Sequence, residues 1–425
     1  MSDIKALMAR RERLLGPNMT TFYRNPVHLV KGEGAWLWDA DGQRYLDCYN
    51  NVPHVGHCHP KVVEAITNQA LTLNTHTRYL HEGILNYAER LTGTLGHDLT
   101  SLIMVCTGSE ANDIALRMGQ AVTGKTGMIG TDNTYHGNTA LVSQFSSKRT
   151  PIGGQADNVR LVPSPDSLRP LGGSGDAQAQ AFADHVARAI NELEAAGHGF
   201  AALILDPFFA NEGFPDLAPG FLTPVADVVR RAGGIIIADE VQPGFGRTGR
   251  HFWGHERIGL VPDVVTMGKP MGNGHPVAAV IARPEIMAAF RNVFGYFNTF
   301  GGNPVSAAAA MAVLDVIEDE GLVENARDVG DYALERMRAI RHPMIADVRG
   351  TGLFLGMEFT KGDDLTPAPE FTENVVEEMR ARGILLNKLG RWGNALKIRP
   401  PMCFSRAQVD LFADTLDDVL KGMPA

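Results

Sequence analysis

Short runs of apolar residues alternate with amphipathic stretches through the middle of this chain. The runs have the length and β-branched content of buried strands, whereas the stretches between them repeat their apolar residues at helical spacing. The predicted strands lie at residues 101–106, 128–130, 200–205, 235–237, 264–267 and 277–281. The helices predicted between them begin at residue 108 and cover residues 184–196 and 223–232. This alternation predicts an α/β fold with a mainly parallel sheet and helices on both faces.

Both ends of the chain add smaller elements. The N-terminal part predicts a helix over residues 1–17 and short strands at 27–30, 35–38 and 44–48. Asp41-Gly42 marks a hairpin turn between the last two strands. After an alanine-rich helix predicted at 305–318, strands and helices alternate up to a final helix at 406–420. Residues 150–180 are rich in Gly, Ser and Pro and predict a long surface loop.

Composition narrows the class of protein. The 425 residues are 44% hydrophobic and 20% charged, which is typical of a soluble globular protein. The net charge of −9 argues against a nucleic-acid surface. The 4 cysteines are widely spaced and form no CxxC pair, so a reducing cytoplasm is expected. The charged N-terminal stretch lacks the apolar core of a signal peptide, and no window is apolar enough to span a membrane.

Two buried-strand runs end in residues of opposite charge. The run at 235–237 leads into Asp239 and Glu240, and the run at 264–267 leads into Lys269. Ligands bind at the carboxyl ends of strands in open α/β sheets. An acid and an amine at that edge suit pyridoxal 5′-phosphate (PLP), which needs a carboxylate for its ring nitrogen and a lysine amine for its aldehyde. Taken alone, acids at a strand end are equally compatible with solvated surface groups.

Two loops offer further cofactor contacts. Gly108 and Ser109 open a helix directly after a strand, where free backbone N–H groups form a ready anion site. The alternative is that Ser109 only caps the helix. Tyr135 follows the strand at 128–130 and is placed either to stack on a planar cofactor or to pack within its loop. The histidine-rich loop at 54–59 has no familiar metal-ligand spacing, so we predict no metal.

Six motifs, in chain order, resemble those of the fold-type I, class III PLP-dependent enzymes. They are GSEAN (108–112), YHG (135–137), DEVQPGFGR (239–247), GK (268–269), NTFGGNP (298–304) and RPP (399–401). The resemblance covers nearly the whole chain. It implies a seven-stranded-type sheet in a large PLP-binding domain over residues 60–310. It also implies a small α/β domain built from residues 1–59 and 311–425, and a homodimer whose subunits share their active sites.

The resemblance also implies a role for each matched residue. Lys269 resembles the Schiff-base lysine that also moves the substrate proton, and Asp239 resembles the partner of the pyridinium nitrogen. The remaining implied cofactor contacts are Val241 under the ring, Tyr135 over it with its neighbour His136, Gln242 at the ring hydroxyl, Gly108 and Ser109 at the phosphate, and Thr299 reaching that phosphate from the neighbouring subunit. Glu240 is expected to be structural.

Within this class the chain is similar to a smaller branch, the phospho-lyases of ethanolamine phosphate and phosphohydroxylysine. The stretches that carry this similarity are 47–60, 73–81, 251–254, 265–278, 296–306, 347–354 and 397–405. It implies elimination of phosphate from ethanolamine phosphate or a related amino-alkyl phosphate, giving an aldehyde, ammonia and phosphate. The alternative is an omega-aminotransferase, which moves an amino group between an amine and an oxo acid.

A phospho-lyase needs a second anion site for the phosphate of its substrate. Arg78 is the preferred candidate because its loop belongs to the lyase-like stretches, and Asn50 lies in another such loop. Lys148, Arg149 and Arg399 are further candidates. Arg399 equally suits a substrate carboxylate, which a guanidinium binds in a planar, bidentate manner. Many aminotransferases carry Glu-Pro where this chain has Asp206-Pro207, which leaves open how Arg399 is gated.

Overall fold

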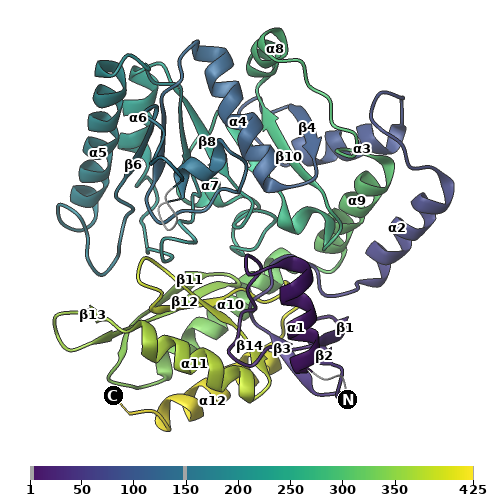
Figure 1. The fold of residues 1–425 in the computed structure, drawn as a ribbon, viewed down its shortest axis with the longest axis vertical. Helices are drawn as coiled ribbons and strands as arrows, with labels where there is room; N and C mark the ends of the chain where they lie inside the picture. Colours follow the sequence, from purple (N-terminus) through teal and green to yellow (C-terminus); the bar gives the residue numbers. More distant parts are fainter. Residues whose placement is uncertain (1–3, 147–150, 425) are drawn as a thin grey trace.

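A seven-stranded sheet forms the centre of the larger part of the molecule. The computed structural model describes residues 4–146 and 151–424. The sheet has the order β4-β10-β9-β8-β7-β5-β6, and it fills the upper half of Figure 1. Its strands are β4 (Ser101–Val105), β5 (Met128–Thr131), β6 (Val159–Val162), β7 (Ala202–Leu205), β8 (Ile235–Asp239), β9 (Val264–Met267) and β10 (Ala278–Ala282).

The sheet is mainly parallel, as predicted. The pairs β9–β8, β8–β7, β7–β5 and β5–β6 run parallel, whereas β10 is antiparallel to both β4 and β9. The predicted loop over residues 150–180 is partly wrong, because it contains β6, and α5 already begins at Asp176. Strand β6 is a four-residue edge strand whose apolar run is broken by Arg160, so it lacks the pattern of the central strands.

Helices cover both faces of this sheet, and the alternation of side chains along β8 shows why. Ile236 packs in the core formed with α5 and α6, whereas Ile235 and Ile237 pack in the core formed with α4 and α8. A strand buried on both faces therefore reads as a continuous apolar run. The helices of this part are α2 (Pro60–Thr72), α3 (Glu82–Thr92), α4 (Gly108–Thr123), α5 (Asp176–Ala195), α6 (Thr223–Arg231), α7 (Gly254–Arg257), α8 (Pro284–Val293) and α9 (Pro304–Asp319), with short 3₁₀ turns η1 (Val142–Phe145) and η2 (Lys269–Gly272).

The smaller part combines both ends of the chain, as Figure 1 shows by its purple and yellow-green ribbons. N-terminal strand β3 pairs in parallel with C-terminal strand β14, with Ile384 opposite Leu46. The strands are β1 (Leu29–Glu33), β2 (Trp36–Asp39), β3 (Arg44–Asp47), β11 (Ile345–Thr351), β12 (Phe354–Lys361), β13 (Thr366–Pro367), β14 (Ile384–Leu385), β15 (Asn387–Leu389) and β16 (Ala395–Ile398). The helices are α10 (Leu322–Ala339), α11 (Pro369–Ala381) and α12 (Arg406–Lys421). The exact domain limits stay a prediction, and residue 310 falls within α9.

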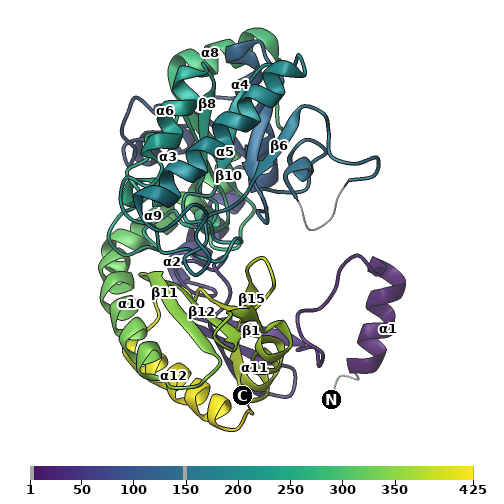
Figure 2. The same ribbon diagram turned by 90° about the vertical axis from the view of Figure 1, so that its left-hand side faces the viewer.

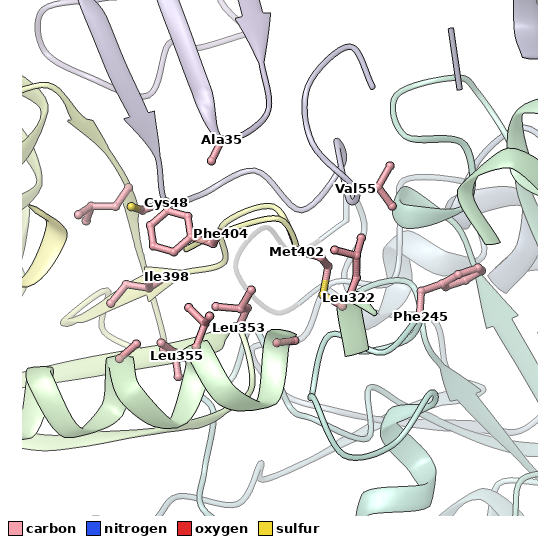
Figure 3. Packing of buried hydrophobic residues seen from close by; sticks show 14 of the residues in the cluster. Ala35, Cys48, Val55, Phe245, Leu322, Leu353, Leu355, Ile398, Met402 and Phe404 are labelled. Carbon is pink, nitrogen blue, oxygen red and sulfur yellow. The ribbon is translucent and has the colours of Figure 1, made fainter. Parts of the chain in front are cut away.

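A continuous apolar core joins the two parts (Figure 3). It brings Val55 from the N-terminal segment and Met402 from the C-terminal segment together with Phe245, which lies in the loop after β8. Each fully buried side chain of this size contributes about 1.5–3 kcal/mol relative to exposure. The core therefore holds the small part against the loop that follows Asp239.

Helix α1 (Ile4–Leu15) is separate from this core. None of its residues is buried, and Figure 2 shows it standing beside the small part. Among the helices that the structure describes, none combines the length and the apolarity needed to cross a bilayer.

Candidate active site

Asp239 is the last residue of β8, and three donors fix its carboxylate. Its Oδ2 atom lies 2.6 Å from Nδ1 of His136 and accepts a hydrogen bond of 2.9 Å from Nδ2 of Asn112. Its Oδ1 atom accepts from the backbone N–H of Val241 at 3.0 Å. Thr266 on β9 donates to Oδ1 of Asn112 at 2.6 Å and so orients that amide. The side chain of Asp239 remains 7% exposed, which leaves a fixed, reachable carboxylate at the strand end.

Lys269 lies beside this carboxylate because β8 and β9 are parallel neighbours. Asp239 is opposite Thr266 in the sheet, and Lys269 follows at the start of η2. Burial lowers the pKa of Lys269, and the positive charge of Arg399 lowers it further, whereas Asp239 acts in the opposite direction. The amine is therefore deprotonated more readily than an exposed lysine, which favours nucleophilic attack.

The start of α4 provides a cradle for an anion. Thr107, not Ser109, is the N-cap, and it forms a capping box with Glu110. The alternative that Ser109 is only a cap is therefore wrong. The Oγ atom of Ser109 accepts from the backbone N–H of Asn138 at 3.2 Å.

Two glycines allow the backbone to close tightly around this cradle. A Cβ atom at Gly108 would lie 2.9 Å from Val241, and one at Gly137, where φ is +140°, would lie 2.5 Å from Oγ of Ser109. Together with the free N–H groups of the helix start, this arrangement suits a phosphate. A held carboxylate, a buried lysine with a lowered pKa and a phosphate cradle at adjoining strand ends fit PLP.

Gln242 connects the loop after β8 to the small part of the molecule. Its Oε1 atom accepts hydrogen bonds from Nη1 of Arg399 at 2.5 Å and from Nζ of Lys397 at 3.2 Å. The amide NH₂ is thus the end of Gln242 that can donate to a ligand. The sequence did not predict Lys397 as a site residue, although it lies in β16 two positions before Arg399, which directly follows the strand, and therefore shares its face.

Two buried acids lie behind these cations. Asp206 accepts backbone hydrogen bonds from Phe208 at 2.8 Å and Ala210 at 3.3 Å. Glu212 accepts from Oγ1 of Thr131 at 2.7 Å. Burial raises the pKa of both carboxyls, and the charge of Glu212 adds to the effect on Asp206. In the part of the chain that the structure describes, no ion pair within 4.0 Å joins Asp206 to Arg399, so Asp206 does not act as a close carboxylate partner of Arg399.

Glu240 is structural, in line with the expectation. Its Oε2 atom accepts from the N–H of Gly254 at 2.8 Å, and its Oε1 atom accepts from the N–H of His255 at 2.7 Å and lies 2.8 Å from the ring of that histidine. The histidine-rich loop is also engaged in structural contacts. His57 pairs with Asp47 at 2.7 Å, and Nε2 of His54 lies 2.7 Å from the carbonyl of Phe245.

The other predicted substrate and cofactor contacts lie on outer loops. The guanidinium of Arg78 stacks 3.9 Å from the centre of the Phe297 ring. Phe297 lies on the exposed loop that also carries Thr299. Asn50 donates to Asp47 at 3.0 Å. Tyr135 is 52% exposed, which leaves its ring face open for stacking. The structure thus places Arg78 with Phe297. Lys148 and Arg149 lie outside the described residues.

Comparisons with known proteins agree with this geometry. The family model described as aminotransferase class-III matches residues 20–420. An alanine–glyoxylate aminotransferase 2-like protein of Drosophila melanogaster is 41% identical over 95% of this chain and 84% of its own length. An ethanolamine-phosphate phospho-lyase homolog of Caenorhabditis elegans is 36% identical over 98% of this chain and 93% of its own.

A solved structure is similar over the full fold. It is a phospholyase from Arthrobacter in complex with phosphoethanolamine, 42% identical, with a TM-score of 0.94 over 98% of this chain and 100% of that chain. The family match over residues 20–420 and the fold-type I architecture lead to one conclusion. The chain belongs to the class III aminotransferase family of PLP-dependent enzymes.

Proposed function

We propose that this enzyme is a phospho-lyase that eliminates phosphate from ethanolamine phosphate or a related amino-alkyl phosphate. The observation that carries the choice is a pair of basic side chains, Arg399 and Lys397, which are buried together on Gln242, while Asp206 does not pair closely with Arg399. Two cations suit a phosphate dianion better than a single carboxylate. Similarity to the phospholyase with bound phosphoethanolamine supports the same choice.

The residues of the site divide the work between binding and proton movement. When bound, PLP supplies the electron sink for the reaction. The amine of Lys269 holds the cofactor and, once released, takes the proton from the substrate carbon that bears the nitrogen. The carboxylate of Asp239 holds a proton on the ring nitrogen, and its three donors keep that carboxylate in place.

The remaining contacts hold the cofactor in position. Gln242 donates to the ring hydroxyl, Val241 and Tyr135 contact the two ring faces, and the start of α4 with Ser109 binds the cofactor phosphate. His136 acts through Asp239, to which it is hydrogen-bonded. In the dimer, Thr299 of the partner subunit completes the phosphate site.

The two candidate reactions differ in the fate of the carbon next to the one that loses its proton. In the lyase reaction, phosphate leaves this carbon with the electron pair of the C–O bond. Water then releases acetaldehyde and ammonia from the remaining fragment of ethanolamine phosphate. In transamination, the phosphate would remain on the substrate, and turnover would need an oxo acid to take up the amino group.

The identity of the products tests this proposal. The holoenzyme mixed with ethanolamine phosphate and no oxo acid should release phosphate, ammonia and acetaldehyde in equal amounts, which coupled assays measure directly. Turnover that requires an oxo acid and leaves the substrate phosphate attached would contradict the lyase and support the aminotransferase. That second candidate rests on Arg399, which can bind a carboxylate, and on the Drosophila relative.

We further propose a homodimer with shared active sites. Large apolar side chains are exposed at the end of α2, on the loop between α2 and α3, on α3, at the end of α8 and on the loop after α8. They are Leu71, Leu73, Tyr79, Leu80, Leu85, Val293, Tyr296, Phe297 and Phe300. Leu80 is 97% exposed and Phe300 is 70% exposed. Exposed apolar area of this kind marks an interface, and it includes the loops of Arg78 and Thr299.

Leu80→Arg should therefore convert the dimer to a monomer, because it would place a charge in a desolvated interface. Activity should fall by about 10²-fold, since each site would lose its contacts from the second subunit. Sedimentation and an activity assay measure both effects. Leu411→Arg is the matched control, because Leu411 is 44% exposed on α12, away from these loops. A dimeric, active Leu80→Arg enzyme would refute this interface.

A reducing, cytoplasmic location is consistent with the cysteines. Cys48, Cys58, Cys106 and Cys403 are all free thiols in the structure.

A further inference from the structure

Lys397 and Arg399 form an unusual pair of buried cations. Lys397 is 6% exposed and Arg399 is 4% exposed, and both donate to the same Oε1 atom of Gln242. Lys397 also donates to Oδ1 of Asn211 at 3.0 Å. Both acceptors are neutral amides. Among the described residues, neither cation has a carboxylate within 4.0 Å.

Buried cations without a carboxylate partner carry a free-energy cost that a bound anion would offset. The Nε atom of Arg399 is buried and has no hydrogen-bond partner in the structure, so part of the guanidinium is left for a ligand. Burial lowers the pKa of both groups, that of Arg399 to about 10, and the charges of Arg399 and Lys269 lower the pKa of Lys397 further. An anion placed between them would relieve the repulsion between these charges.

The two residues are held at one place by the strand that carries them. Lys397 lies in β16 and Arg399 directly follows it, so their side chains project from the same face of the sheet. The backbone N–H of Arg399 donates to the carbonyl of Cys48 at 2.8 Å, and its guanidinium lies 4.9 Å from the centre of the Tyr49 ring. Lys269 is close enough for its charge to act on Lys397. The pair therefore faces the same site as the reactive amine.

We propose that Lys397 is a specificity-determining residue that binds the phosphate of the substrate together with Arg399. This proposal rests on the proposed lyase function and deepens it. Arg399 alone provides one positive charge, which is enough for a carboxylate. Lys397 adds a second basic group, whose protonated form a bound dianion favours, and a further N–H donor, so the pair selects a phosphate dianion over a carboxylate.

The test uses the holoenzyme with the substitutions Lys397→Met and Lys397→Arg. Lys397→Met removes the charge but keeps most of the volume, and it should raise the KM for ethanolamine phosphate by roughly 10- to 100-fold, the range for a lost charged hydrogen bond. Lys397→Arg keeps the charge and should retain most of the affinity. Calorimetry with inorganic phosphate should show the same order of affinities, independent of turnover.

Two controls separate this role from a structural one. Cofactor content and the affinity for ethanolamine, which has no phosphate, should be unchanged in Lys397→Met. Lys388→Met should resemble the wild type in all assays, because Lys388, on the neighbouring strand β15, is paired with Glu373 of α11.

The outcomes distinguish the inference from the proposed function. If the wild type releases phosphate and Lys397→Met has an unchanged KM, the role of Lys397 is wrong and the lyase stands. If the wild type releases no phosphate, the proposed lyase function is wrong. Calorimetry with inorganic phosphate then tests whether Lys397 binds phosphate. Inorganic phosphate that binds equally to the wild type and Lys397→Met would then overturn this inference too, whereas weaker binding to Lys397→Met would support it.

Discussion

Lys269→Ala should reduce turnover by about 10⁴-fold or more, because it removes both the covalent anchor of the cofactor and the base that moves the substrate proton. Lys269 is buried next to Asp239 and Arg399, and its lowered pKa favours the reactive neutral amine. Replacement by alanine leaves no other amine at the end of β9. Borohydride reduction of the holoenzyme followed by peptide mass spectrometry should place the cofactor on Lys269 in the wild type only.

Lys269→Ala should nevertheless fold. Among the described residues, the buried amine of Lys269 forms no salt bridge, so its removal breaks no ion pair. Circular dichroism would verify the fold, and an added small primary amine should restore part of the proton transfer. Wild-type turnover by the folded variant, or a cofactor fixed to a different lysine, would refute the assignment of Lys269.

Asp239→Asn is expected to produce the second-largest loss, about 10³-fold in kcat, because it replaces a preorganised charge by a neutral amide of the same shape. The cofactor should still attach to Lys269. Asparagine would also place its NH₂ group against one of the present donors, either the N–H of Val241 at the Oδ1 position or Nδ2 of Asn112 at the Oδ2 position. Steady-state kinetics and the cofactor spectrum would show an enzyme that is loaded but slow.

Glu240→Gln is the matched control for Asp239→Asn. Glu240 is the adjacent acid, and its carboxylate holds the start of α7 through Gly254 and His255. Its substitution should lower the stability by about 1–3 kcal/mol, the cost of unsatisfied buried groups, with little effect on kcat. An equal loss of kcat in both variants would mean that Asp239 has no special role at the ring nitrogen.

The strands around the site could be predicted because they are buried on both faces. Such strands appear as unbroken apolar runs in the sequence. Strand β9 ends where its run ends, whereas β8 continues past the run at 235–237 to include Asp239. Strand β6 escaped prediction because an edge strand lacks this pattern. The motif residues Asp239 and Lys269 could be named because a strand end and its charge are local features.

Contacts between distant segments could not be predicted in the same way. Asn112 and Thr266 position Asp239 from two other elements, and only the folded chain brings them together. One alternative, that Ser109 caps α4, is wrong because Thr107 is the cap. Residue type alone could not decide, since Ser and Thr are both favoured at this position. The pairing of Lys397 with Gln242 spans 155 positions, and no local pattern encodes it. The roles of Arg78 and Thr299 stay predictions, because they depend on the proposed dimer.

The most direct test of the proposed lyase is the number of phosphate ions released per subunit when ethanolamine phosphate is in excess and no oxo acid is present. A lyase regenerates its lysine-bound cofactor in each cycle. We therefore expect many phosphate ions per subunit, with ammonia in equal amount and an unchanged cofactor spectrum at the end. No phosphate release, with the cofactor converted once to its aminated form, would contradict the account.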